Sequence, residues 1–236
     1  MRKLMISIFA ILLSSCITPA FAASTATVRD VVTALEKSYS GANDIQASFI
    51  QRATIAAVKR EEKGAGELLI KKGAGNAMFR FDYTKPRQSI ISNGKTVWYY
   101  LPENRQVMVM STSSLFAGGN AIAMSYLTGL GNISRDFSAQ FVGNGRDKNG
   151  NYVIALTPKR SNPSVAKLEL TVSASIVNSF MAGRTPKSSF PIIASVLYDN
   201  MGNRTMIEYS NIRVNSGISS SKFSFRPPAG VEVIKR

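Results

Sequence analysis

The sequence predicts a mainly β protein of antiparallel strands, with one helix near the N-terminus and a helical insertion in the middle of the chain. Two observations support this fold class. Apolar and polar residues alternate with a period of two in many segments, and polar turn sequences separate these segments. No segment has the strand–helix–strand pattern of a parallel sheet. The 236 residues are 44% hydrophobic and 18% charged, so the chain can bury a folded core.

The first 22 residues are expected to be a secretory signal peptide. A short basic patch precedes an apolar run from Leu4 to Leu13, and Ala20-Phe21-Ala22 supplies the small residues of a cleavage site. The apolar run is too short for a membrane span, which needs about 20 residues. We therefore expect residues 23–236 to form a single domain after cleavage.

A second processing route has to be considered for the same region. Leu13-Ser14-Ser15-Cys16 has the form of a lipobox, and cleavage before Cys16 would leave a lipidated cysteine. The domain would then be tethered to a membrane. Ala20-Phe21-Ala22 is the more regular cleavage site and favours the untethered protein.

One amphipathic helix is predicted at the start of the mature chain. Thr27 and Asp30 are spaced as a capping box, and Gly41 is a typical helix end. Between them, apolar residues recur at helical spacing from Val28 to Leu35.

From about residue 45 the pattern changes to roughly eight to eleven short strands joined as hairpins. Phe79, Phe81 and Tyr83 form one apolar face, and Asn93-Gly94 is the dipeptide of a type I′ turn between two strands. Phe223-Ser224-Phe225 is expected to close the pattern as a further strand.

A segment from Ser111 to Phe137 departs from the strand pattern. It combines apolar residues with glycines, which predicts one or two short helices inserted between strands. These helices could plug the core or cover the sheet as a lid. Large apolar residues on both faces of residues 97–110 indicate that something covers the second face, whether a lid, a ligand or a partner.

Composition excludes several classes of function. The chain has no histidine and a single cysteine, Cys16, which lies in the expected signal peptide. Histidine-dependent catalytic sites, disulfides and cysteine or histidine metal sites are therefore excluded from the mature protein. No phosphate-binding or dinucleotide-binding motif is present. We expect neither an enzyme, nor a cofactor, nor a metal site.

The net charge of +15 points to an anionic partner or simply to solvation. In a cytoplasmic chain such a charge would suggest nucleic acid. For an exported chain it favours anionic lipid headgroups or an acidic protein face, and no nucleic acid is expected as a partner. The basic residues are scattered, so general solvation stays open as the alternative.

Several segments stand in the order found in one family of carriers. They include Phe79–Pro86 (FRFDYTKP), Ile91–Tyr100 (ISNGKTVWYY) and Phe223–Val231 (FSFRPPAGV), supported by Ile45–Gln51 and Leu156–Lys159. These segments resemble the outer-membrane lipoprotein carrier protein family, LolA. The resemblance is collinear over about residues 28–234.

The resemblance implies an open, incomplete antiparallel β-barrel whose helices form a lid over a hydrophobic cavity. It also implies a monomeric periplasmic carrier that binds the acyl chains of lipoproteins. Such a carrier takes acylated lipoproteins from an inner-membrane ABC transporter of the LolCDE type. It delivers them to an outer-membrane receptor of the LolB type.

We assign candidate site residues of three kinds, two from the resemblance and the third from a departure from it. The cavity walls are assigned to Phe79, Phe81, Ile91, Trp98, Tyr100 and Met108. The lid is assigned to Leu115, Phe116, Ile122, Tyr126 and Leu127. An apolar loop that could touch a membrane or a partner is assigned to Ile176, Val177, Phe180 and Met181.

The chain departs from the family pattern in two places. Where the family has an Arg-Pro step whose arginine latches the lid, this chain has Lys71-Lys72-Gly73, and residues 174–190 look like an insertion. The loop and the lipobox together support an alternative, a membrane-tethered receptor similar to LolB. Two further alternatives are a carrier of another amphiphilic envelope lipid and a periplasmic scaffold with a filled core.

Overall fold

The computed structural model describes residues 25–73, 77–117, 133–161, 165–184 and 189–235, without the side chains of residues 115–117. The expected signal peptide lies outside these residues. Within them, the helices are α1 (Val28–Ser40), α2 (Thr112–Ala117), α4 (Ile133–Asp136) and α5 (Ala174–Met181), with 3-10 turns η1 (Ala56–Val58) and η2 (Ser220–Phe223). No helix among them has the length and apolar character needed to cross a bilayer.

The described strands form one 12-stranded sheet in the order β12-β6-β5-β4-β3-β2-β1-β11-β10-β9-β8-β7. Their bounds are β1 Asp44–Ile55, β2 Arg60–Lys71, β3 Met78–Lys85, β4 Gln88–Ser92, β5 Thr96–Leu101, β6 Gln106–Ser111, β7 Phe137–Arg146, β8 Tyr152–Pro158, β9 Lys167–Val172, β10 Ile192–Tyr198, β11 Arg204–Val214 and β12 Glu232–Lys235. Neighbouring strands are antiparallel except β12, which pairs parallel to β6. β7 and β12 are the two edges, so the sheet does not close. This confirms the expected mainly β, open antiparallel architecture.

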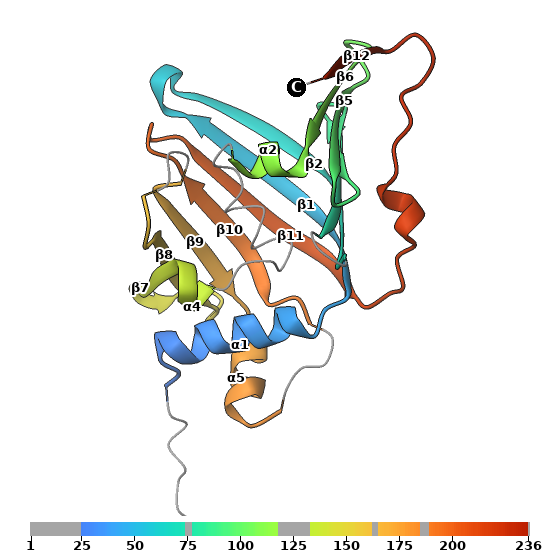
Figure 1. The fold of residues 1–236 in the computed structure, drawn as a ribbon. Helices are drawn as coiled ribbons and strands as arrows, with labels where there is room; N and C mark the ends of the chain where they lie inside the picture. The colour runs from blue at the N-terminus through green and yellow to red at the C-terminus, as the bar shows by residue number, and fades with distance from the viewer. Residues whose placement is uncertain (1–24, 74–76, 118–132, 162–164, 185–188, 236) are drawn as a thin grey trace, which may run out of the picture.

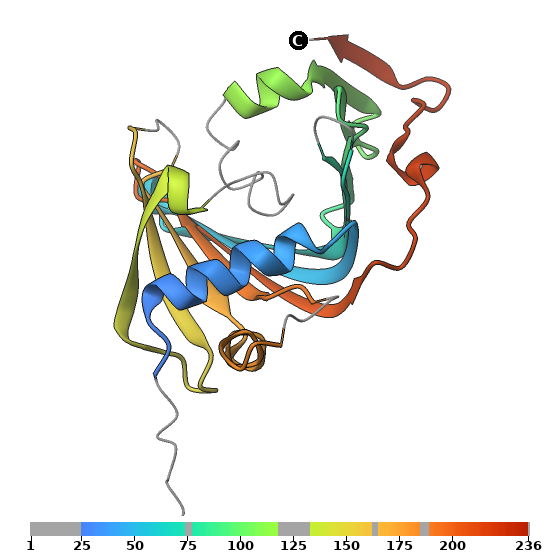
Figure 2. The ribbon, with the colours of Figure 1, turned by 60° about the horizontal axis from the view of Figure 1, so that its bottom comes forward.

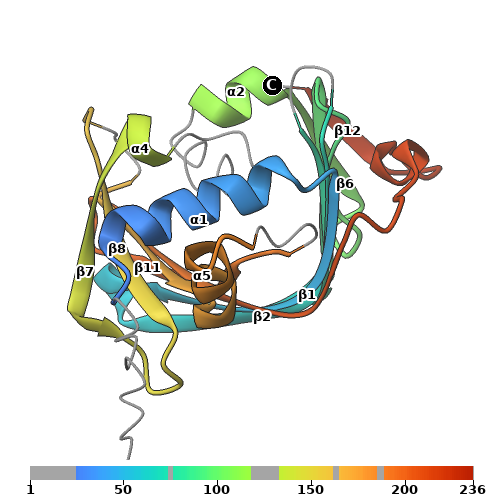
Figure 3. The ribbon, with the colours of Figure 1, turned by 90° about the horizontal axis from the view of Figure 1, so that it is seen from below.

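The sheet curves around the helices, with α1, α2 and α4 on its concave side (Figures 1 and 2). The view from below shows α1 lying across the opening of the curve (Figure 3). We call the concave side the inner face and the convex side the outer face. The C-terminal segment, defined as residues 215–235, runs along the outer face beside β3–β6 and then joins the edge of the sheet as β12 (Figure 3).

Helix α1 begins and ends as its sequence predicts. Thr27 Oγ1 accepts a hydrogen bond from the Asp30 backbone N–H at 3.2 Å, and Asp30 Oδ2 accepts one from the Thr27 N–H at 2.8 Å. The Gly41 N–H donates to the Lys37 carbonyl at the other end. The buried face of α1, which includes Val31 and Leu35, belongs to the main core on the inner face. The helix packs against α5, α4 and β7.

The turn at Asn93-Gly94 differs from the expected type I′ turn. Such a turn needs positive φ at both central residues, and here Gly94 has φ +89° while Asn93 is not in that region. Ser92 pairs with Val97 and the Asn93 N–H donates to the Thr96 carbonyl, so Gly94 and Lys95 lie at the centre of the turn, one residue later than expected. The Asn93 side chain accepts hydrogen bonds from the N–H groups of Lys95 and Thr96 and so stabilises this turn.

Two other segments differ from the sequence prediction. Phe223-Ser224-Phe225 is not a strand: Phe223 ends η2 and is fully buried against the sheet. Residues 174–181, expected within an exposed loop, form α5. The insertion at 111–137 does contain helices, α2 and α4, at its two described ends.

Candidate functional site

The register of β1–β6 divides the side chains between the two faces of the sheet. Residues that pair directly across strands point to the same face. One cross-strand row runs Ala47–Leu68–Phe81–Ile90–Tyr99–Met108, and a second runs Ile45–Ile70–Phe79–Ser92–Val97–Met110. Both rows lie on the inner face, because Phe79, Phe81 and Val97 share the core of α1.

Burial changes along the inner face. Phe79, Phe81 and Val97 are buried, whereas Ile90, Tyr99 and Met108 are only partly buried. Neither of the two rows contains a charged residue. Toward β6, the inner face is therefore apolar and partly accessible.

The six residues expected to form one cavity wall do not share a face. Phe79, Phe81 and Met108 are on the inner face, in the two rows described above. Ile91, Trp98 and Tyr100 are on the outer face. The register explains this division: Phe81 pairs with Ile90 and Ile90 with Tyr99, so the next residue of each strand points to the opposite side.

The outer-face residues belong to a separate apolar layer. Ile91 is fully buried but outside the main core cluster, and the rings of Trp98 and Tyr100 lie 6.4 Å and 5.1 Å from that of Phe225. Phe225 is part of the C-terminal segment. These side chains hold that segment on the sheet and are not available to an inner cavity wall.

Ile90, Tyr99 and Met110 also lie on the inner face, although the sequence pattern did not single them out. A usable signal was the connection between β3 and β4. Tyr83 pairs with Gln88, which leaves an even number of residues between them. With an even number, odd positions of one strand face even positions of the next, so Phe81 had to be grouped with Ile90 rather than Ile91.

The residues assigned to the lid fall mostly outside the described residues. Leu115 and Phe116 lie in α2, which packs beside β5 and β6 on the concave side of the sheet (Figure 2). Their side chains are not among those described, and Ile122, Tyr126 and Leu127 lie in the range that the structure does not describe.

The four residues assigned to an apolar loop are on α5. Val177 is fully buried in the main core, and Phe180 is partly buried with Lys37 Nζ 5.9 Å from its ring centre. Ile176 is also partly buried, and Met181 is 39% exposed. The segment is thus a helix docked on α1, because its apolar side chains follow helical spacing and pack inward.

The lysines at the expected latch position hold two different elements. Lys72 Nζ donates a hydrogen bond of 2.6 Å to the carbonyl of Ser40, the last residue of α1. Lys71 Nζ donates to the carbonyl of Ile218 in the C-terminal segment. A positive charge at the C-terminal end of a helix also interacts favourably with the helix dipole.

Two phenols on the inner face are paired with glutamines. Tyr83 Oη donates to Gln51 Oε1 at 2.9 Å, and Tyr99 Oη donates to Gln88 Oε1 at 2.8 Å. Burial raises the pKa of Tyr83 to about 12, with a smaller contribution from Tyr99, and burial also raises the pKa of Tyr99. Both side chains are therefore neutral hydrogen-bond donors near neutral pH.

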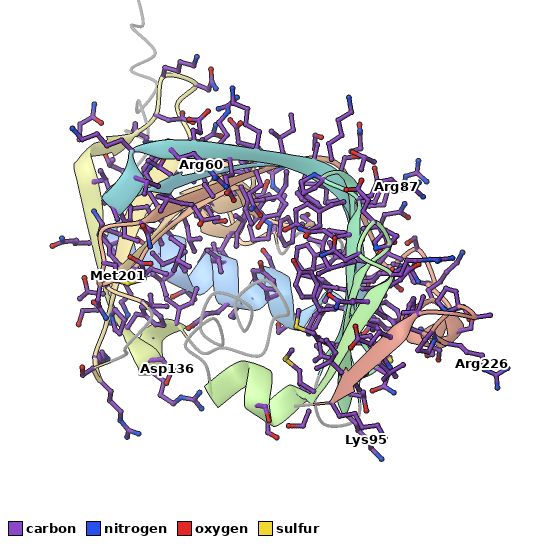
Figure 4. The ribbon with its side chains drawn as sticks, turned by 90° about the horizontal axis from the view of Figure 1, so that it is seen from above. Arg60, Arg87, Lys95, Asp136, Met201 and Arg226 are labelled. Carbon is purple, nitrogen blue, oxygen red and sulfur yellow. The ribbon has the colours of Figure 1, made fainter. Side chains whose placement is uncertain are left out.

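Over β1 and β11 the outer face is polar. A groove of about 510 Å³ lies over the β1–β11 bulge and is lined by Gln46, Ser48, Glu67, Asn211, Ile212 and Arg213. Basic side chains such as Arg60, Arg87 and Arg226 lie at the periphery of the molecule (Figure 4). Across the described residues, no three His, Cys, Asp or Glu side chains are grouped to hold a metal ion.

Comparison with known proteins agrees with this geometry. A family model described as "Outer membrane lipoprotein carrier protein LolA" matches residues 40–182. The chain is 30% identical over 204 residues to an outer-membrane lipoprotein carrier protein of Neisseria meningitidis serogroup B, with 86% of each chain covered. It is 25% identical over 229 residues to the protein of the same name from Azotobacter vinelandii, covering 97% of this chain and 99% of the relative.

Among solved structures, the fold is similar to that of an uncharacterized conserved protein from Thermus thermophilus. The TM-score is 0.52 at 14% sequence identity, over 88% of this chain and 98% of the other. The family match spans more than half of the chain, and the sequence relatives extend over most of it. The chain therefore belongs to the LolA family of outer-membrane lipoprotein carrier proteins.

Proposed function

We propose that this protein binds the acyl chains of lipoproteins on the inner face of its curved sheet and carries them through the periplasm. As a member of the LolA family it is a lipoprotein carrier. The observation that carries the proposed binding site is the partly buried apolar surface of Ile90, Tyr99, Met108 and Met110, on the side of the sheet that faces α2.

The size of the hydrophobic effect explains why such a surface is needed. Burying a methylene group stabilises by roughly 0.8 kcal/mol, so an acyl chain of about 16 carbons costs on the order of 12 kcal/mol to leave in water. A lipoprotein with several chains requires a carrier to cross an aqueous compartment. Methionines suit this surface because their unbranched side chains adapt to ligands of varying shape.

A lid is proposed to cover this apolar surface of the sheet. Leu115 and Phe116 on α2, with Ile122, Tyr126 and Leu127, would cover bound acyl chains and shield them from water. The backbone position of α2 beside β5 and β6 supports this assignment. A contact with a membrane or partner is proposed for the segment of Ile176, Val177, Phe180 and Met181, and it would be made through Met181, which is 39% exposed.

We propose that the free energy of the bound lipoprotein falls at each transfer between partners. The donor would be an inner-membrane ABC transporter of the LolCDE type, and the acceptor an outer-membrane receptor of the LolB type. Without ATP outside the cytoplasm, each transfer requires a partner with higher affinity for the acyl chains. Removal of residues 1–22 takes away Arg2 and Lys3, so the 29 basic and 14 acidic residues of the full chain become 27 and 14, and the mature net charge of +13 would favour the approach of an acidic partner face.

The binding site is tested with a charge on the inner face. We expect Met108→Glu to weaken binding of a synthetic triacylated lipopeptide at least tenfold, because a carboxylate there must be desolvated next to the acyl chains. Met201→Glu is the matched control, since Met201 is 78% exposed in the β10–β11 turn. Equal affinity of the two variants, with both shown to be folded by circular dichroism, would contradict the proposal that the inner face is the binding site.

Processing and localisation are tested by intact mass. We propose a signal peptide of residues 1–22 and a monomeric single domain of residues 23–236. Mature protein from its native envelope should begin at Ala23 and be recovered from the periplasmic fraction. A mass that begins at a triacylated Cys16 would support the tethered, LolB-like receptor instead.

A further inference from the structure

Six hydrogen-bonding side chains form a band across the inner face, among largely apolar rows. We call this band the polar belt and define it by six residues on six strands: Ser195, Tyr209, Gln51, Tyr83, Gln88 and Tyr99. Three hydrogen-bonded pairs compose it: Ser195 Oγ with Tyr209 Oη at 3.3 Å, Tyr83 with Gln51, and Tyr99 with Gln88.

The backbone of β2 allows the centre of the belt to form. β2 lies between β1 and β3, and it has Gly64 and Gly66 at the positions beside Gln51 and Tyr83. A Cβ at Gly64 would lie 3.1 Å from the Tyr83 ring, so that ring covers the glycine. The Tyr83 hydroxyl thereby reaches across β2 to Gln51.

Each tyrosine of the two accessible pairs fixes the orientation of a glutamine amide. The phenol O–H donates to Oε1, so the Oε1 atoms of Gln51 and Gln88 are both engaged. Among the described residues, neither Nε2 group has a hydrogen-bond partner. Gln51, Gln88 and both tyrosines are only partly buried. Two amide N–H₂ donors therefore remain available beside cross-strand rows that contain no charged side chain.

We propose that Gln51 and Gln88 donate hydrogen bonds from Nε2 to the ester or amide carbonyl oxygens that join acyl chains to the cargo. This inference rests on the proposed acyl-binding function, and it adds what determines how far each acyl chain enters the site. The hydrocarbon lies against the apolar rows, and the carbonyl groups lie at the polar belt. Tyr83 and Tyr99 are positioning residues, since they act on the cargo through the glutamines.

The spacing of the belt fits two carbonyl groups better than one. Gln51 is on β1 and Gln88 on β4, three strand intervals apart, which corresponds to about 14 Å along the sheet. A carbonyl oxygen accepts hydrogen bonds only from donors about 3 Å away, so backbones this far apart favour two separate acceptors. The two glutamines would therefore bind carbonyls of different acyl chains, which matches a cargo with more than one chain.

Two synthetic lipopeptides with identical chain lengths test the proposal. One carries the S-glyceryl-cysteine group with two ester-linked palmitoyl chains, and the other carries the same chains through ether bonds. We expect the wild-type protein to bind the ester form about tenfold more tightly, because the ether lacks carbonyl acceptors. Gln51→Met combined with Gln88→Met should reduce the ratio of the two affinities to about one by weakening only ester binding.

The control and the contrary outcomes separate this inference from the proposed function. Gln46→Met makes the same change on the outer face and should leave the affinity ratio unchanged. Tyr83→Phe should lower the ratio while the affinity for the ether form stays constant, which a purely structural role would not produce. A wild-type ratio of one, or a ratio retained in the double variant, overturns the inference alone. Failure of the wild-type protein to bind either lipopeptide overturns the proposed function and this inference with it.

Discussion

At the scale of single residues, the absence of a side chain at Gly66 shapes the inner face. Phe49 on β1 and Tyr83 on β3 both pair with Gly66, and their rings meet across it at 4.9 Å in an edge-to-face contact. A Cβ at Gly66 would lie 2.0 Å from the Asp82 carbonyl oxygen. The register shift of the β2–β3 pair at this point brings the two backbones close together.

Gly66→Ala is therefore expected to destabilise the protein by about 2–4 kcal/mol, because the backbones of β2 and β3 must separate. Gly64→Ala is the graded control: its Cβ would meet the Tyr83 ring first, at 3.1 Å, and a side chain can move. Urea unfolding of both variants measures the difference. A loss at Gly66 no larger than that at Gly64 would contradict the close approach.

Asp44 connects the start of β1 to the C-terminal segment. Its carboxylate accepts hydrogen bonds from the backbone and side chain of Ser216 and from the N–H groups of Gly217 and Ile218. Burial acts to raise the pKa of Asp44, but these hydrogen bonds outweigh it and the pKa is lowered overall. Charged hydrogen bonds of this kind stabilise the folded state.

A lowered pKa in the folded state gives Asp44 a defined pH dependence. Its contribution is present above the unfolded pKa of about 3.9 and is lost as the pH falls through the lower, folded value. We expect Asp44→Asn to cost about 1–3 kcal/mol at pH 7 and much less near pH 2. Unfolding at both pH values measures this. An equal cost at both, or an equal cost for the exposed control Glu103→Gln, would argue against the contact.

At the scale of elements, α5 shows how an apparent insertion becomes part of the core. Val177 is inaccessible to solvent, whereas Met181 in the last turn is 39% exposed. α5 packs against α1, so removing residues 176–182 would open the core beneath α1. Point substitutions can separate packing from a docking role.

Val177→Ala is expected to cost about 2 kcal/mol, because it leaves a cavity beside α1. Met181→Ala should change stability by less than about 0.5 kcal/mol, since it removes exposed surface. Thermal unfolding compares the two. If Met181→Ala leaves the transfer of lipoproteins to the receptor unchanged, that result contradicts the proposed contact of α5 with a membrane or partner.

At the scale of the whole molecule, the sheet is apolar on both faces, and a different part of the chain packs on each face. The inner face packs on α1, and the outer face of β3–β6 is covered by the C-terminal segment through Phe223 and Phe225. Arg80 Nη1 adds a hydrogen bond of 3.1 Å to the Lys222 carbonyl. This arrangement explains the apolar character of both faces of β5 and β6.

The fluorescence of Trp98 can detect whether the C-terminal segment packs on the outer face. Trp98 is the single tryptophan of the chain and lies beside Phe225. Phe225→Ala should shift its fluorescence emission to longer wavelength as water reaches the ring. Phe141→Ala, on β7 at the opposite edge of the sheet, is the control and should leave the emission unchanged. An unchanged spectrum in Phe225→Ala would contradict the docking of the C-terminal segment on Trp98.

Much of the fold could be predicted from local patterns. The capping box at Thr27, the alternation at Phe79 and Phe81, and the helical insertion all have local causes, and they agree with the structure. The site was harder to predict. Grouping Ile91, Trp98 and Tyr100 with Phe79 depended on turn lengths and strand register, and one residue of difference places a side chain on the opposite face.

The sequence by itself determined the N-terminal helix, most of the strands, the family segments and the apolar character of both faces, because these depend on neighbouring residues and on period. The tertiary structure alone decided which apolar face is inner and which is covered by the C-terminal segment. It also decided that α5 packs on α1 and that Lys72 binds the end of α1. Those outcomes depend on contacts between residues far apart in the chain, and no local pattern encodes them.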